Sequence, residues 1–191
     1  PQIGDKKKLL DLSLKNAFMF KQNHLRIKTK QQEDSDRTLR QLQDDLRLKS
    51  IPRVIECFDN SNIQGIHPTA SMVYFKNGKP LKQQYRHYNI KTVIGPNDFS
   101  SMTEIIHRRY ERLLTENKDL PDLIVIDGGK GQLSAACISL KNLGIYGKIP
   151  IIGIAKRLEE IYFPEDSIPI YLSKKSSTLK LLQFIRDEAH R

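Results

Sequence analysis

The chain of 191 residues carries 32 Lys and Arg against 22 Asp and Glu, a formal charge of +10 with a pI of about 9.6. It contains no apolar run of membrane-spanning length, no secretory signal and only two cysteines, which excludes a membrane-spanning protein, a disulfide scaffold and a cysteine zinc site. We therefore expect a cytoplasmic protein whose partner is a polyanion, with nucleic acid favoured over an acidic membrane surface.

Residues 1–50 predict a basic helical lead-in. Apolar residues recur at helical spacing over 5–28, a polar break follows at 31–36, and a second short helix ends before Pro52. We interpret this segment as a linker between domains, with DNA binding by its basic surface as the alternative. Because the chain begins with Pro1 rather than Met, we expect it to be part of a longer protein.

Residues 51–191 predict a second domain of short strands and helices. Strands are predicted at 53–59, 69–75, 81–90, 123–127 and 150–155, a hairpin at 160–163 and 168–172, and helices at 100–116, 132–143 and 177–191. A meander of strands followed by alternating helices and strands predicts an α/β fold with a mixed sheet flanked by helices. This order of elements is that of the ribonuclease H-like fold.

Two predicted strands end in a carboxylate. Asp127 follows the buried apolar run 123–126, and Asp59 ends the strand that begins near residue 53. In a ribonuclease H-like fold these two strands are parallel neighbours, so the carboxylates would lie side by side. Adjacent carboxylates repel each other unless a cation lies between them, and hard oxygen ligands suit Mg²⁺ or Mn²⁺. The alternative is that each aspartate only caps a turn or a helix.

A glycine-rich turn follows Asp127 directly, with Lys130 among three glycines over 128–131. It lacks the ending of a Walker A loop and the spacing of a dinucleotide-binding loop. A backbone nest for a DNA phosphate, assisted by Lys130, fits the pattern better. A nucleotide-binding phosphotransferase is the alternative.

His190 and Asp98 are two further candidates. His190 follows an acidic pair on the last predicted helix, where it could ligate a metal, move a proton or serve only a structural role. Asp98 precedes the helix at 100–116 and most simply caps it.

Basic side chains are expected around these carboxylates. We predict that Arg108, Arg109, Lys130 and Lys156 contact DNA phosphates without reading bases. Arg112 shares the predicted face of the arginine helix, but solvation of a surface explains it equally well.

Four ordered segments resemble the UvrC family, the nuclease subunit of the bacterial UvrABC nucleotide excision repair system. They are ECFDNS at 56–61, YRHYNI at 85–90, IDGGKGQL at 126–133 and RDEAHR at 186–191. The resemblance implies a ribonuclease H-like domain that makes the 5′ incision beside a DNA lesion, with Asp59, Asp127 and His190 as catalytic residues. It implies a further acidic residue at Asp98, although Asn97 departs from the residue usual before it.

The same resemblance implies Mg²⁺ or Mn²⁺ as cofactor and damaged double-stranded DNA as substrate. In the full-length protein it implies UvrB as partner, with UvrA acting upstream. The alternative from another functional class is a non-catalytic DNA-binding or scaffolding module on the same fold.

Overall fold

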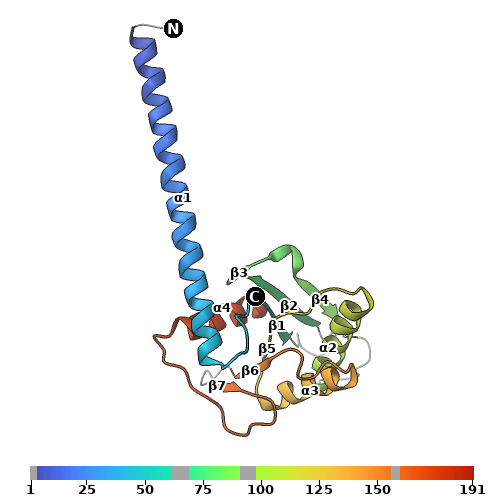
Figure 1. Ribbon diagram of the computed structural model, residues 1–191. Helices are drawn as coiled ribbons and strands as arrows, with labels where there is room; N and C mark the ends of the chain where they lie inside the picture. Colours follow the sequence, from blue (N-terminus) through green and yellow to red (C-terminus); the bar gives the residue numbers. More distant parts are fainter. Residues whose placement is uncertain (1–3, 62–68, 91–97, 156–159) are drawn as a thin grey trace. The chain divides into compact units, whose positions relative to one another are not determined.

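The computed structural model describes residues 4–61, 69–90, 98–155 and 160–191 (Figure 1). The chain forms two compact units, Pro1–Arg37 and Thr38–Arg191. None of the helices within the described ranges has the length and apolar character needed to cross a membrane.

The first helix, α1 (Asp5–Asp45), is continuous, so the prediction of two helices separated by a polar break was wrong. Residues 5–51 contain neither glycine nor proline, so nothing in the backbone forces a break. Polar side chains four residues apart also support the helix, because Gln32 donates to Asp36 at 3.4 Å and Gln41 donates to Asp45 at 2.8 Å.

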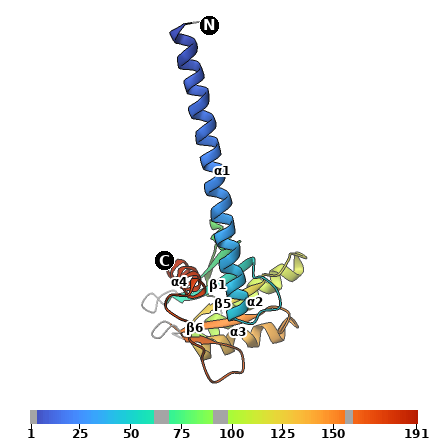
Figure 2. The same cartoon turned by 60° about the vertical axis from the view of Figure 1, so that its left-hand side comes forward.

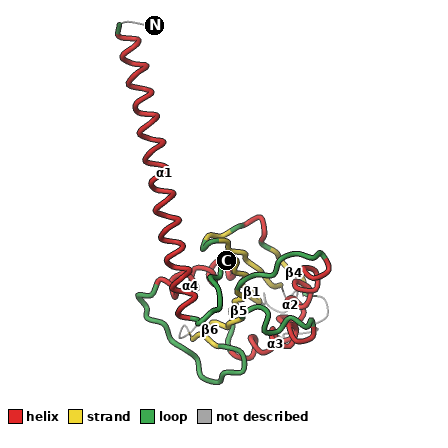
Figure 3. Tube along the Cα trace, viewed as in Figure 1, coloured by secondary structure: helices red, strands yellow, loops and turns green. Residues whose placement is uncertain are grey.

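A mixed sheet forms the centre of the second unit (Figure 3). Its strands are β1 (Val54–Ser61), β2 (Thr69–Lys76), β3 (Lys79–Pro80), β4 (Arg86–Asn89), β5 (Leu123–Asp127), β6 (Ile151–Ala155) and β7 (Glu160–Tyr162). Their order is β3-β2-β1-β5-β6-β7, and β4 also pairs with β2. The pairs β1–β5 and β5–β6 are parallel and the others are antiparallel. The prediction of a mixed α/β sheet is confirmed.

Helices cover both faces of this sheet (Figure 2). Successive strand side chains point to opposite faces of the sheet. On one face, α2 (Asp98–Thr115) and α3 (Lys130–Asn142) bury them. On the opposite face, α4 (Ser177–His190) packs together with Leu39, Leu42 and Leu46 against β1, β2 and β5. Both cysteines are buried and neither forms a disulfide.

Two predicted strands are shorter than expected. In place of a strand over 81–90, the chain forms the 3₁₀ helix η1 (Lys82–Gln84) before β4, and the Arg86 guanidinium donates to the carbonyls of Gln83 and Tyr85. The second arm of the late hairpin is only a single bridge between Ile170 and Ile161. Pro169 precedes this bridge, and proline cannot donate to a strand ladder.

Candidate active site

Two carboxylates stand side by side where β1 and β5 leave their parallel pairing. The last pair in register is Phe58 with Ile126, so Asp59 and Asp127 are the next residues on neighbouring strands. Both follow the side-chain parity of Cys57 and Val125, which face α4. The two aspartates therefore project to the same face of the sheet.

These positions exclude a turn cap for Asp59 and a helix cap for Asp127. Asp59 lies inside β1, paired with Ser71 of β2, and not in a turn. Helix α3 begins after Gly129, which is its N-cap residue and has no side chain to cap it, so Asp127 is not that cap.

The last turn of α4 brings an imidazole to the same place. Two hydrogen bonds fix this turn, because Ser71 Oγ donates to the carbonyl of Ala189 and Tyr85 Oη donates to Glu188 at 3.2 Å. Burial and the Glu188 carboxylate raise the pKa of Tyr85 to about 12, so the phenol remains a donor at neutral pH. The next residue, His190, then reaches the sheet edge.

Asp59, Asp127 and His190 form one cluster of potential metal ligands. One ligand atom from each residue lies within 4.8 Å of the others. His190 Nδ1 is 3.0 Å from Asp59 Oδ2, so the ring is held over the carboxylate when Nδ1 carries a proton to donate. The Asp59 side chain is 8% exposed and that of His190 is 57% exposed. One side of the cluster is therefore buried and the other faces solvent.

An open cleft of about 480 Å³ leads to this cluster. Besides the three residues, it is lined by Phe99, Ala155, Gln132 and the glycines at 128, 129 and 131. A Cβ on Gly129 would meet nothing within 4 Å, so this part of the loop is open to an approaching group. A Cβ on Gly128 would instead lie 1.8 Å from Gln132 Oε1, a buried oxygen without a hydrogen-bond partner among the described residues.

The predicted DNA-contacting residues lie in different surroundings. Arg109 points inward, where its guanidinium contacts the buried Glu56 carboxylate at 2.5 and 3.3 Å. Arg108 is 35% exposed and bonds Glu104 and the carbonyl of Asn89, both at 2.9 Å.

Lys130 is exposed at the start of α3. Lys156 lies outside the described residues. Asp98 is the first residue of α2, but its side chain also lies outside the description.

Sequence reasoning missed the buried pair of Glu56 and Arg109, although a signal was present. Arg109 lies four residues after Ile105 and four before Leu113, both on the apolar stripe of α2, so helical spacing places it on the buried face. Tyr110 completes the group, because its hydroxyl donates to Glu56 at 3.0 Å. The ion pair favours a structural role for Arg109, and its contact with DNA stays a prediction.

Comparison with known proteins gives a consistent result. Residues 43–191 match the model of a family described as the UvrC RNAse H endonuclease domain. An alignment of 195 residues that covers the whole chain gives 60% identity to UvrABC system protein C of Flavobacterium johnsoniae. An alignment of 191 residues gives 61% identity to that of Cytophaga hutchinsonii. In both cases it spans 32% of the relative's length, so it corresponds to about a third of those proteins.

Solved structures show more distant similarity. A Ciona intestinalis Endonuclease V in complex with an inosine-containing DNA is 18% identical with a TM-score of 0.42, and the match covers 83% of this chain and 68% of that one. Human ENDOV is 14% identical with a TM-score of 0.39, over 66% of this chain and 59% of that one.

Proposed function

Because the chain belongs to the family of UvrC RNase H endonuclease domains, we propose that it makes the 5′ incision beside a lesion in double-stranded DNA. The observation that carries the proposal is the convergence of Asp59, Asp127 and His190 from β1, β5 and α4 on one open cleft. These three residues are the proposed catalytic centre. The chain is about a third of its curated relatives, so the substrate and partners of the longer protein are part of the proposal.

The donor set of this centre fits a hard divalent cation. Two carboxylates and one imidazole within 4.8 Å of one another could bind Mg²⁺ or Mn²⁺, which take oxygen ligands and also bind phosphate oxygens. Such an ion, when bound, would lower the pKa of a water molecule and neutralise charge on the scissile phosphate. Asp59 and Asp127 would hold the ion from the buried side, and the exposed His190 ring would complete the site or move a proton.

The protein itself supplies position and access. The strands β1 and β5 fix the two carboxylates relative to each other, and the two hydrogen bonds at the end of α4 fix the imidazole. The open space at Gly129 admits the sugar–phosphate backbone to the cleft, and the exposed Lys130 provides a cation beside it.

His190 is tested by replacement with alanine. We expect cleavage to fall by about 10²–10⁴-fold, the range for a lost acid–base group, while DNA affinity stays within about twofold. Incision rates and binding curves on the same damaged duplex measure the two effects. His107→Ala is the matched control, because His107 is a partly exposed histidine of α2, 3.8 Å from Glu111, that does not line the cleft. A lower melting temperature with a normal rate per folded molecule would instead make His190 structural.

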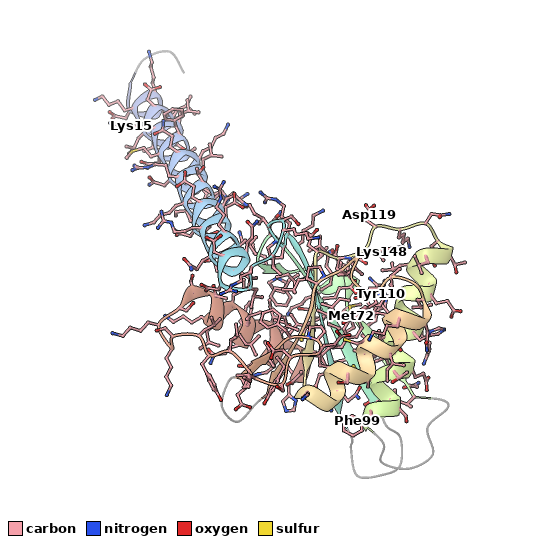
Figure 4. All side chains as sticks on the ribbon, turned by 60° about the horizontal axis from the view of Figure 1, so that its bottom comes forward. Lys15, Met72, Phe99, Tyr110, Asp119 and Lys148 are labelled. Atoms are coloured by element: carbon pink, nitrogen blue, oxygen red, sulfur yellow. The ribbon has the colours of Figure 1, made fainter. Side chains whose placement is uncertain are left out.

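DNA binding should weaken steeply with salt. Lys130→Gln should reduce the slope of log K against log salt by about 1, since each lost phosphate contact releases about one fewer counterion. Arg108→Gln should also reduce the slope. Lys148→Gln is the control, because Lys148 is exposed and lies at the other end of the domain from Phe99 (Figure 4). An affinity that is indifferent to ionic strength would contradict the proposed phosphate contacts of Arg108, Arg109, Lys130 and Lys156.

We assign lesion recognition and docking to the longer protein, with UvrB as the partner and UvrA upstream. The alternative function is a non-catalytic DNA-binding or scaffolding module. A cleavage assay on damaged or nicked DNA, with UvrB and the full-length protein, separates the two. The module would bind without cutting, whereas the nuclease would cut at the 5′ side and lose this activity on chelation of divalent cations.

A further inference from the structure

One large aromatic side chain lies exposed at the rim of the proposed catalytic cleft. Phe99, in the first turn of α2, lines the same cleft as Asp59, Asp127 and His190, and it is 56% exposed. Figure 4 shows it at the end of the helix, away from Tyr110, which packs between α2 and the sheet. Core packing therefore does not account for a phenylalanine at this position.

The Phe99 ring packs against the first turn of α3, at Gly131. A Cβ on Gly131 would lie 2.4 Å from Cε1 and 2.8 Å from Cζ of Phe99, so only glycine permits this contact. Gly131 is not among the residues with positive φ, so its backbone conformation alone does not require glycine. The backbone of Phe99 is held in turn, because Thr103 Oγ1 donates to its carbonyl at 3.0 Å. The ring is thus supported on one side by the first turn of α3 and exposed on the other.

The chemistry of the surroundings restricts what this exposed ring can contact. The cleft contains two carboxylates, which disfavour an anionic ligand except where a cation lies between. A DNA strand crossing the cleft offers a neutral, flat base next to each phosphate. An aromatic face stacks on any of the four bases, which suits an enzyme that must cut without regard to sequence.

We infer that Phe99 is a stacking platform for one nucleobase of the incised strand, next to the phosphate held at the carboxylates. This inference rests on the proposed function and adds a base-binding subsite to it. Phe99 touches no reacting atom, so its role is to position the strand. Stacking there would fix the backbone at the cleft while leaving the sequence free.

The inference is tested by a cycle that removes the ring and the base separately. The full-length protein carries Asp127→Asn to prevent cutting, and its affinity is measured for duplexes in which one nucleotide near the incision point is abasic. With phenylalanine present, the abasic change should weaken binding by about tenfold at one position, within the range for a lost stacked base. With Phe99→Leu, the same abasic change should have almost no effect on affinity. With Phe99→Trp, the abasic change should weaken binding again.

Two controls keep the result specific. Ile168→Ala removes another exposed apolar side chain, 72% exposed and outside the lining of the cleft, and should leave the abasic effect unchanged. The melting temperature of Phe99→Leu should match that of the parent, since the ring is exposed.

Equal abasic effects with and without the ring, at every position, would overturn the inference. If the protein with Asp127 restored still incises DNA in that case, the stacking role of Phe99 is wrong and the proposed function stands. If it makes no incision at all, the proposed function fails, and the cycle still reports whether the ring contacts a base.

Discussion

Replacing Asp127 with asparagine should lower incision by about 10³-fold or more while the domain stays folded. A carboxylate ligand contributes to transition-state charge stabilisation worth several kcal/mol, and each 1.36 kcal/mol is a factor of ten in rate. Asp59→Asn should act in the same way, because Asp59 is the neighbouring carboxylate of the same cluster. Incision rates at saturating DNA measure the loss of activity, and calorimetric titration with Mn²⁺ measures the change in metal affinity.

The same substitution should not destabilise the metal-free domain. Asp59 and Asp127 are like charges on adjacent strands, so neutralising one relieves repulsion and should leave the melting temperature in a chelator equal or higher. Asp119→Asn is the matched control, since Asp119 is exposed and lies at the opposite end of the domain from Phe99 (Figure 4). An Asp127→Asn protein that cuts at the parental rate would remove the carboxylates from the proposed mechanism.

The second large effect is expected on stability, at the buried ion pair beneath α2. Arg109→Met leaves the Glu56 carboxylate, whose side chain is 1% exposed, without its cation, which should cost about 3–5 kcal/mol. Adding Glu56→Gln should recover most of this loss, because glutamine is neutral and can still accept from Tyr110. Burial and the Glu56 carboxylate raise the pKa of Tyr110, so its hydroxyl remains protonated to donate. Midpoints of denaturant unfolding for the two single variants and the double variant give the coupling energy.

This experiment also tests whether Arg109 contacts DNA. If Arg109→Met has parental stability and binds DNA more weakly, the guanidinium acts at the DNA surface and not in the core. If stability falls and the double variant regains both stability and affinity, the residue is structural.

The strand-end carboxylates could be predicted from local sequence because their signals are local. The apolar run, Asp127 and the glycine turn follow one another in the sequence. They predict the end of a buried strand without any information about distant contacts. Side-by-side placement of Asp59 and Asp127 also required the parallel register of β1 and β5, which came from the order of elements. His190 is 131 residues from Asp59, so the sequence offered it only as a candidate, and the family resemblance assigned it to the cluster.

The remaining features depend on tertiary contacts that no local pattern encodes. The seat of Phe99 on Gly131 joins two helix starts, and the contact of Gln132 with Gly128 depends on how the loop turns. The continuity of α1 was obscured for a different reason, because a polar stretch in a solvent-exposed helix has the composition of a loop. Only the lack of glycine and proline pointed to a helix there.

The hydrogen bonds that fix the last turn of α4 also lead us to expect an order of folding. The contact between His190 and Asp59 closes a loop of most of the domain, and contacts of such long range form late in folding because loop-closure entropy opposes them. Until Ser71 and Tyr85 form their hydrogen bonds to the end of α4, Asp59 and Asp127 lack the imidazole of His190 beside them. If His190 acts as proposed, a nascent or partly unfolded copy is expected to be inactive until the end of α4 has docked.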